Sequence, residues 1–502
     1  MEDDATILST GHVTSSESVD VPSDFENLAS SNSQNSASNP ANPDIQEEVF
    51  VSADDQYVSD SALSLPGPSS DDDISFRQRK LTMLMTEEDE SELSSSWKEK
   101  KSHIFVLTEA GKPVYSRHGC EDKLSSLMGV MVAIVSCVHD RNDTIRSIVA
   151  GNRKFVFLIK LPLVLVAVSS ALETIHQIEI HLHYVYNTII SVVSLSQLNR
   201  IYSTQKNYDL RRLLTGTDKF LDHLCNSMDQ DPQYLLRAVK CLPLAGHMRD
   251  FVGQSLQQSK TDDLAFAVLV SSGQVVSICR LKEHNLDTTD LQVLLNLVNA
   301  SATSFHAGES WLPICLAQFN PSGFLHAHIS FLDEKLQTCL IFLSADRDAF
   351  FTLCECKKKV VAKLNKHKCL EAIHLAYSKA DYTVSKVGIP ELWHFLYKTN
   401  NISQFTCPEF SVPYHNEKQR QRLFGLYQEM HGKIHNPAAP LKLHYSVSDE
   451  ETLLAWVASG FELYATFSPL VTKNQAISAV DRLLRWIKHR EDELFMMRTL
   501  TF

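Results

Sequence analysis

The sequence has 502 residues, 44% of them hydrophobic, and is long enough for several hydrophobic cores. Its charge is unevenly distributed. Residues 1–96 contain 21 acidic and 3 basic residues, whereas the remainder contains 39 acidic and 44 basic residues. This weakly basic remainder can approach an anionic membrane or an acidic partner. It lacks the strongly basic character of nucleic-acid-binding domains, so we exclude nucleic acid as a partner.

The cysteine spacing and the hydropathy exclude further classes. The eleven cysteines form no C-x-x-C pair, so they indicate neither a zinc site nor a disulfide framework. The N-terminal residues lack the basic and apolar regions of a signal peptide. The longest apolar region, residues 155–168, is interrupted by Lys160 and Pro162 and is shorter than the ~20 residues of a spanning helix. We therefore expect a soluble protein of the cytoplasm.

Residues 1–96 form a tail that is rich in Ser, Asp, Asn and Pro. This composition buries too little apolar surface to offset the entropy of ordering, so we predict a disordered, acidic, Ser-rich tail. A basic and apolar segment, residues 77–85, precedes the acidic run 87–90. Two interpretations stay open: a docking, membrane-touching or phosphorylation-controlled segment, or an ordinary polar tail with one adhesive stretch.

The first folded domain is predicted over residues 97–230. It starts with a strand hairpin, 104–108 and 114–116, and continues with a helix that begins near Glu121. From Val130 to Val135 this helix is apolar on nearly all sides. A helix without a polar face must be covered on both sides, by its own sheet and by further helices or another protein.

Three strongly apolar strands and a long amphipathic helix complete this domain. Near-continuous apolar runs are typical of a sheet that is covered on both faces. The strands are expected at 144–149, 155–159 and 163–169, and the helix at 172–193.

The same plan repeats over residues 240–380 and 390–502. In the second copy, we expect strands at 264–270, 275–281, 311–319, 324–332 and 336–343, and helices at 287–298 and 349–377. In the third copy, we expect strands at 393–398, 404–407, 442–447, 452–457 and 461–467, and helices at 417–431 and 475–495. A period this long does not indicate a solenoid. The sequence predicts three copies of one α/β domain, each an antiparallel five-stranded sheet flanked by helices.

The sequence contains no motif for a phosphate-binding loop, a nucleophile elbow or a zinc-binding helix. The nearest candidates on the helix at 172–193 are His176, Glu179, His181 and His183, of which all but His181 share its polar face. His326 and His328 share one face of a strand. A solvent-facing or hydrogen-bonded role explains these residues more simply than metal ligation. The sequence predicts no catalytic residue, no metal site and no cofactor.

Two basic stripes are candidates for membrane contact. Lys359, Lys363 and Lys366 share one helical face, and Arg482 and Arg485 share a face of the last helix. Each basic residue near an anionic leaflet contributes about 1 kcal/mol. The alternative is that each stripe is the solvated side of an amphipathic helix.

Two long motifs point to a known family. Residues 101–119, KSHIFVLTEAGKPVYSRHG, and residues 153–170, RKFVFLIKLPLVLVAVSS, frame a β-β-α-β-β order that is similar to the longin fold of trafficking proteins. With the threefold plan, they closely resemble the SAND family, the Mon-one subunits of the Mon–Ccz complex, over about residues 97–502. The resemblance implies three consecutive longin-like domains after the tail.

The resemblance also implies an activity and a partner. Members of this family form a heterodimer with Ccz-one, a second three-longin protein, and promote guanine nucleotide exchange on a late-endosomal, Rab-seven-class GTPase. The first longin domains of the two subunits pair, the GTPase docks across the pair, and exchange involves no covalent chemistry. The candidate partner-interface residues lie on the apolar helix: Leu127, Val130, Met131 and Ile134.

The resemblance further implies a peripheral membrane protein on the cytosolic face of endosomes and lysosomes. It would be recruited by an early-endosomal Rab GTPase and a phosphoinositide, and would drive endosome maturation and fusion with the lysosome or vacuole. Longin folds also serve in adaptors and coats. The alternative function is therefore a non-catalytic adaptor or tether that binds a Rab GTPase.

Overall fold

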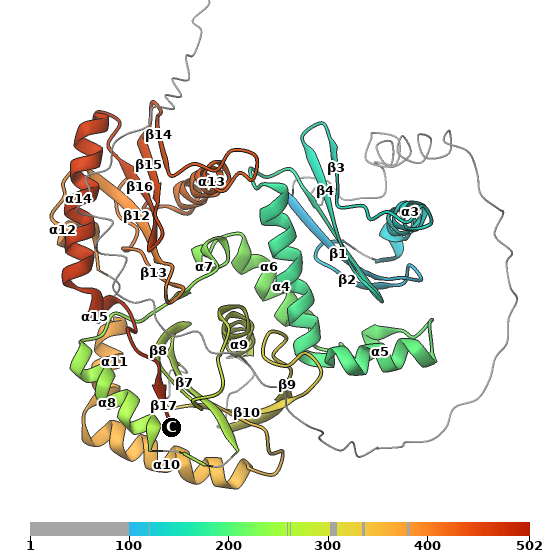
Figure 1. The fold of residues 1–502 in the computed structure, drawn as a ribbon, viewed down its shortest axis with the longest axis horizontal. Coiled ribbons are helices and arrows are strands. Elements are labelled where there is room, and N and C mark those ends of the chain that lie inside the picture. The colour runs from blue at the N-terminus through green and yellow to red at the C-terminus, as the bar shows by residue number, and fades with distance from the viewer. Residues whose placement is uncertain are drawn as a thin grey trace, which may run out of the picture.

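The computed structural model describes residues 100–502 except 120, 259, 262, 302–308, 334–336 and 379–381. The predicted tail, residues 1–96, and its basic segment lie outside the described residues. Three sheets follow one another along the chain, and helices cover them (Figure 1). The arrangement confirms the predicted fold class, α/β with three consecutive domains of one plan.

The first sheet has five antiparallel strands in the order β2-β1-β5-β4-β3. They are β1 (Ser102–Thr108), β2 (Pro113–Ser116), β3 (Ser147–Ala150), β4 (Arg153–Lys160) and β5 (Leu163–Ser169). Because side chains alternate along a strand, Ile104 and Val106 of β1 enter one core while Phe105 and Leu107 enter another. Helix α3 (Glu121–His139) covers the second of these cores, and α4 (Ile175–Val193) covers the first.

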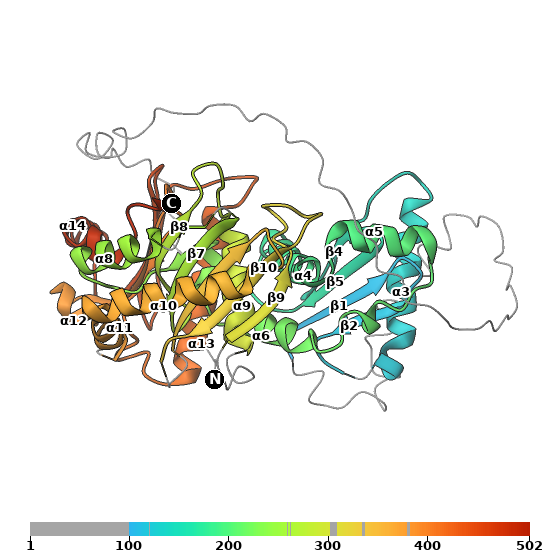
Figure 2. The ribbon, with the colours of Figure 1, turned by 90° about the horizontal axis from the view of Figure 1, so that it is seen from below.

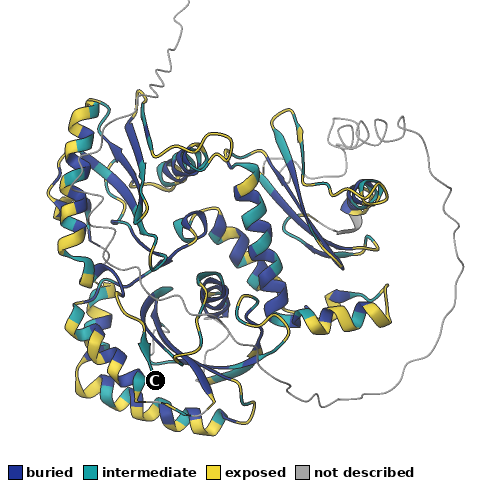
Figure 3. Ribbon diagram, in the orientation of Figure 1, coloured by how far each residue is buried: buried dark blue, intermediate teal, exposed yellow. Residues whose placement is uncertain are grey.

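Helix α4 runs through the middle of the molecule and is buried along most of its length (Figure 3). It begins at Ile175 rather than at the predicted residue 172, because Thr174 and Gln177 form a capping box there. Its Tyr184 hydroxyl donates a 2.6 Å hydrogen bond to Gln292 Oε1 in the second domain. Four short elements follow it: α5 (Leu195–Thr204), the 3₁₀ helix η3 (Leu210–Arg212), α6 (Asp218–Met228) and α7 (Pro232–Leu236).

The second sheet is built on β7 (Leu264–Ser271), β8 (Gln274–Arg280), β9 (Glu309–Ile314), β10 (Leu325–Phe331) and β11 (Thr338–Ser344). Phe266 and Val268 of β7 face helix α9 (Thr288–Ser301), which the Asp287 side chain caps by accepting from the Thr289 N–H. The intervening Ala267 and Leu269 face the other core, which α8 (Gly246–Gln257) and α10 (Phe350–Lys366) cover.

The third sheet is built on β12 (Leu392–Thr399), β13 (Gln404–Thr406), β14 (Leu443–Val447), β15 (Thr452–Val457) and β16 (Phe461–Phe467). Helix α13 (Glu417–Ile434) covers one face, and α14 (Lys473–His489) covers the other. The short helices α12 (Val384–Val387) and α15 (Glu491–Leu494) lie before the first strand and after α14.

The second and third sheets each gain a sixth strand that the sequence did not predict. Strand β17 (Leu500–Thr501), at the end of the chain, pairs in parallel with β8 of the second sheet. Strand β6 (Val239–Lys240) pairs in parallel with β13 of the third sheet. Each of these two-residue strands therefore connects the second and third domains.

The helix predicted over 349–377 is two helices, α10 and α11 (Cys369–Ser378). The break falls at Lys368, whose φ of 54° lies in the left-handed region. Helix α11 then packs against α8. Among the described residues, no helix is both long and apolar enough to span a membrane.

Candidate partner-binding surface

Helix α3 lies on the side of the first sheet that faces away from the second and third sheets (Figures 1 and 2). Three of the four predicted interface residues, Leu127, Met131 and Ile134, are buried against the first sheet, and Met131 is fully inaccessible. These three side chains are therefore core residues of their own domain. Only Val130 of the predicted set is half-exposed, and its contact with a partner stays a prediction.

The outward face of α3 is made of small side chains rather than large apolar ones. Ser126, Gly129 and Ser136 are exposed, and Ala133 is half-exposed. A Cβ atom built on Gly129 would meet no atom of the described residues within 4 Å. Small residues at this spacing would let a second helix approach closely, so the face is suited to helix pairing.

Beside this face, strand β3 forms an edge of the first sheet, and among the described residues its one pairing partner is β4. Its Val149 is 62% exposed. An edge strand offers unpaired backbone groups to which another chain can add. The sequence predicted the strand but not its place at the edge, because strand order depends on pairing between distant segments.

The opposite edge, strand β2, is covered by its own chain. Arg117 forms a 2.7 Å ion pair with Asp229 at the end of α6, and Lys112 Nζ lies 2.6 Å from the Asn207 carbonyl. The Tyr115 hydroxyl donates a 2.6 Å hydrogen bond to Asp222, and burial raises the pKa of this tyrosine above its ordinary value. With β2 covered, β3 is the edge that stays available to another protein.

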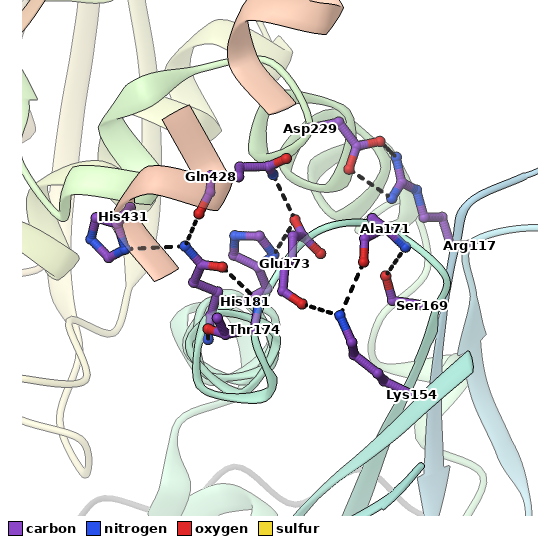
Figure 4. Close-up of polar contacts among 11 residues, drawn as sticks. Arg117, Lys154, Ser169, Ala171, Glu173, Thr174, His181, Asp229, Gln428 and His431 are labelled. Carbon is purple, nitrogen blue, oxygen red and sulfur yellow. Dashed lines mark hydrogen bonds and ion pairs between the residues drawn. The ribbon is translucent and has the colours of Figure 1, made fainter. Parts of the chain in front are cut away.

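A polar seam fixes the first domain against the third (Figure 4). The Gln177 side chain donates to the Gln428 carbonyl at 3.2 Å and contacts His431 Nδ1 at 3.0 Å. Glu173 accepts a 2.9 Å hydrogen bond from the Gln428 side chain, and Lys154 donates to the Glu173 carbonyl. Burial lowers the pKa of His431 to about 3, so this imidazole is neutral near pH 7 and its Nδ1 can accept.

The two predicted basic stripes differ in their surroundings. On α10, Lys359 and Lys366 are exposed and Lys363 is half-buried. On α14, Arg482 pairs with Glu391 at 3.3 Å, and Arg485 Nε donates to the Asp481 carbonyl at 3.2 Å. The α10 lysines therefore present the more available charge, and their contact with a membrane stays a prediction.

The histidines singled out in the sequence are placed separately. His176 forms an exposed, 3.8 Å pair with Glu179, and His326 stacks on Trp311. His328 is buried and meets Glu309 and Cys354, two residues that the sequence did not connect with it. Their separation along the chain gave no local spacing from which this cluster could be found.

The three sheets and their flanking helices define this chain as a protein of three longin domains. Residues 102–224, 262–362 and 391–491 match, in this order, the family models of the first, second and third longin domains of FUZ, MON1 and HPS1. These matches confirm the longin character that the β-β-α-β-β order predicted.

Individual relatives that align over most of the chain identify its family among the longin proteins. The chain is 46% identical to "Protein SAND" of Takifugu rubripes over 83% of this chain and 79% of the relative. It is 46% identical to "Vacuolar fusion protein MON1 homolog A" of Gallus gallus over 84% of this chain and 76% of the relative. Identity to the human homolog B is 43%, over 80% of this chain and 76% of the relative. The chain belongs to the SAND/MON1 family.

Proposed function

We propose that this chain is one subunit of a heterodimeric guanine nucleotide exchange factor for a late-endosomal, Rab-seven-class GTPase. The observation that carries the proposal is the family membership, which extends over more than four fifths of the chain. The proposed partner is a second three-longin protein similar to Ccz-one. Relatives named vacuolar fusion proteins support a role in membrane trafficking, here in endosome maturation and fusion with the lysosome or vacuole.

The first longin domain supplies the surface that such a partner needs. Its α3 face and β3 edge point away from the other two domains, whereas α4 and the Gln177 seam hold the opposite side in place. A rigidly held domain with one open side presents a preformed surface, so little ordering entropy opposes pairing. The GTPase would dock across the two paired first domains.

Exchange needs no nucleophile or metal from the exchange factor. A surface that binds the nucleotide-free GTPase more tightly than the nucleotide-bound form shifts the equilibrium towards nucleotide release, by an amount set by the difference in affinity. The work done by this chain would be binding and positioning. It would act without covalent chemistry and without a cofactor of its own.

Recruitment would place the heterodimer on the cytosolic face of endosomes and lysosomes as a peripheral protein. We infer that an early-endosomal Rab GTPase and an anionic, phosphoinositide-containing membrane provide the anchoring contacts. Lys359, Lys363 and Lys366 would contribute to the second of these, with a smaller part for Arg482, which already pairs with Glu391.

The test is release of a fluorescent guanine nucleotide from the late-endosomal Rab. Purified heterodimer should accelerate release, whereas either subunit alone should not. If the heterodimer forms and release is not accelerated, the exchange function is wrong.

The alternative is a non-catalytic adaptor or tether that binds a Rab GTPase. Preference for one nucleotide state distinguishes the two functions. Tighter binding to the nucleotide-free GTPase supports exchange, and tighter binding to the GTP-loaded form supports the adaptor.

A further inference from the structure

Three side chains of the second domain, which offer an oxygen, a nitrogen and a sulfur atom as ligands, come together at a place far from α3. Glu309 opens β9, His328 lies in the middle of β10, and Cys354 lies in the second turn of α10. Glu309 Oε2 is 3.2 Å from His328 Nε2 and 2.8 Å from Cys354 Sγ. The third distance, from Cys354 Sγ to His328 Nε2, is 3.6 Å.

This triangle has nearly the dimensions of one face of a zinc coordination tetrahedron. With bonds of about 2.3 Å to sulfur, about 2.0 Å to nitrogen and about 2.1 Å to oxygen, tetrahedral angles require edges of about 3.5 Å for S–N, about 3.4 Å for N–O and about 3.6 Å for S–O. The observed S–N and N–O distances, 3.6 Å and 3.2 Å, agree with these edges. The S–O distance alone must lengthen, by about 0.8 Å. Glu309 can provide this by rotating its side chain, which is 27% exposed.

The surroundings support ligation as well. Lys357 Nζ binds the other carboxylate oxygen, Glu309 Oε1, at 2.9 Å, so the carboxylate is oriented with Oε2 towards the histidine and the thiol. The rings of Phe342 and Phe350 lie about His328, with centroids at 6.1 Å and 5.6 Å. This apolar wall fixes the imidazole and limits access of water on the inner side.

A second interpretation, a thiol nucleophile activated by a histidine and a carboxylate, does not fit the geometry. In such an arrangement the thiol and the carboxylate contact opposite ring nitrogens of the histidine. Here Glu309 and Cys354 both contact the same atom, His328 Nε2. Three donor atoms directed at one point suit an ion between them.

We propose that Glu309, His328 and Cys354 form a zinc-binding site with three protein ligands and an open fourth position. Cys354 would bind as the thiolate, and its proton would pass to solvent as the zinc–sulfur bond forms. The fourth ligand would be water on the outer side, where Glu309 and Cys354 are accessible. The ion would tie the start of α10 to two strands of its sheet, and so fix the helix that carries Lys359, Lys363 and Lys366.

Cobalt substitution tests the site on the purified full-length protein. Co²⁺ should produce a thiolate charge-transfer band in the near ultraviolet that saturates at one equivalent and is displaced by Zn²⁺. Cys354→Ser should abolish the band, and Glu309→Gln, which removes a charged ligand, should weaken cobalt binding by at least about 10-fold. Cys137→Ser, which removes a half-buried cysteine of α3, is the matched control and should leave the band unchanged.

Thermal unfolding provides an independent readout. One equivalent of Zn²⁺ should raise the melting temperature of the parent, a chelator should reverse the effect, and Cys354→Ser should respond to neither. Equal melting temperatures of metal-free parent and variant show that the variant is folded. A parent without a stoichiometric band, or a Cys354→Ser variant that keeps it, overturns the proposal. Neither result depends on exchange activity.

Discussion

Gln177 on α4 and His431 on α13 lie 254 residues apart along the chain, yet Gln177 Nε2 and His431 Nδ1 are 3.0 Å apart. The same amide group also donates to the Gln428 carbonyl, while its oxygen accepts from the backbone N–H of Thr174 at 2.7 Å. One side chain therefore caps a helix of the first domain and binds it to a helix of the third.

Replacing this side chain should loosen the seam. We expect Gln177→Ala to lower the free energy of unfolding by about 1–3 kcal/mol, because it leaves buried polar groups of both domains without partners. Chemical denaturation measures the loss, and hydrogen exchange should show it concentrated at the start of α4 and in α13. Gln197→Ala, on the exposed face of α5, is the control and should change stability by less than about 0.5 kcal/mol. Equal losses for the two variants would show that the seam contributes nothing.

The same seam makes stability depend on pH. The pKa of His431 is lowered to about 3, chiefly by burial, with His435 and Lys398 acting in the same direction and Glu462 opposing them. Since the unfolded chain binds this proton below about pH 6.5 and the folded chain does not, stability should fall as the pH decreases from about 6.5 towards 3.

The slope from this histidine approaches about 1.4 kcal/mol per pH unit. His431→Asn, whose amide oxygen can still accept from Gln177, should reduce the slope between pH 6 and 5 by about that amount. Denaturation curves at several pH values measure it. An unchanged slope would mean that His431 does not resist protonation in the folded state.

The outer face of α3 can be tested without disturbing the core. Gly129→Arg should leave the fold at least as stable, because a Cβ there has free space and glycine is unfavourable within a helix by about 1 kcal/mol. It should nevertheless prevent pairing with the three-longin partner, since the long charged side chain occupies the close-approach face.

Co-purification with the partner is the measurement, and Ser203→Arg on the exposed face of α5 is the control. Met131→Asp is not a usable probe, because Met131 is fully buried and its loss of partner binding would follow from unfolding of the first domain. A Gly129→Arg chain that still co-purifies would move the interface away from α3.

Strand β3 provides a separate probe of the same surface. Val149→Lys places a charge on an exposed edge strand, a device by which natural sheets prevent strand addition. We expect normal folding, with binding of the partner or the GTPase weakened at least about tenfold, or about 1.4 kcal/mol. Val447→Lys makes the same change on β14, an edge of the third sheet where the valine is 55% exposed, and should bind like the parent. Similar weakening by both changes would indicate a general charge effect.

Residue patterns predict the five main strands of each sheet but not the features that depend on distant contacts. The strands of the first domain could be predicted because buried central strands such as β5 are apolar at every position. The apolar stretch of α3 was recognised, but it could not reveal that Leu127 and Met131 face the sheet while Gly129 faces outwards.

Other features have no local pattern at all. Strands β6 and β17 have two residues each and exist only because a distant strand accepts them. The end of α10 depends on a left-handed φ at Lys368, a lysine in a sequence of strong helix formers. Glu309, His328 and Cys354 come together only when β9, β10 and α10 have packed.

The lysines of α10 should matter for membranes but not for exchange in solution. Changing Lys359, Lys363 and Lys366 to Glu should weaken binding to anionic liposomes, by up to about 1 kcal/mol for each charge lost. Nucleotide release without liposomes should be unchanged, because α10 covers the second sheet and lies apart from α3. Changing Arg482 and Arg485 to Glu should have the smaller effect, since Glu391 already partners Arg482.

Liposome sedimentation at two salt concentrations measures both variants, because an electrostatic contact weakens as salt increases. If the triple lysine variant binds liposomes like the parent, these lysines do not contact the membrane and are only the solvated side of an amphipathic helix.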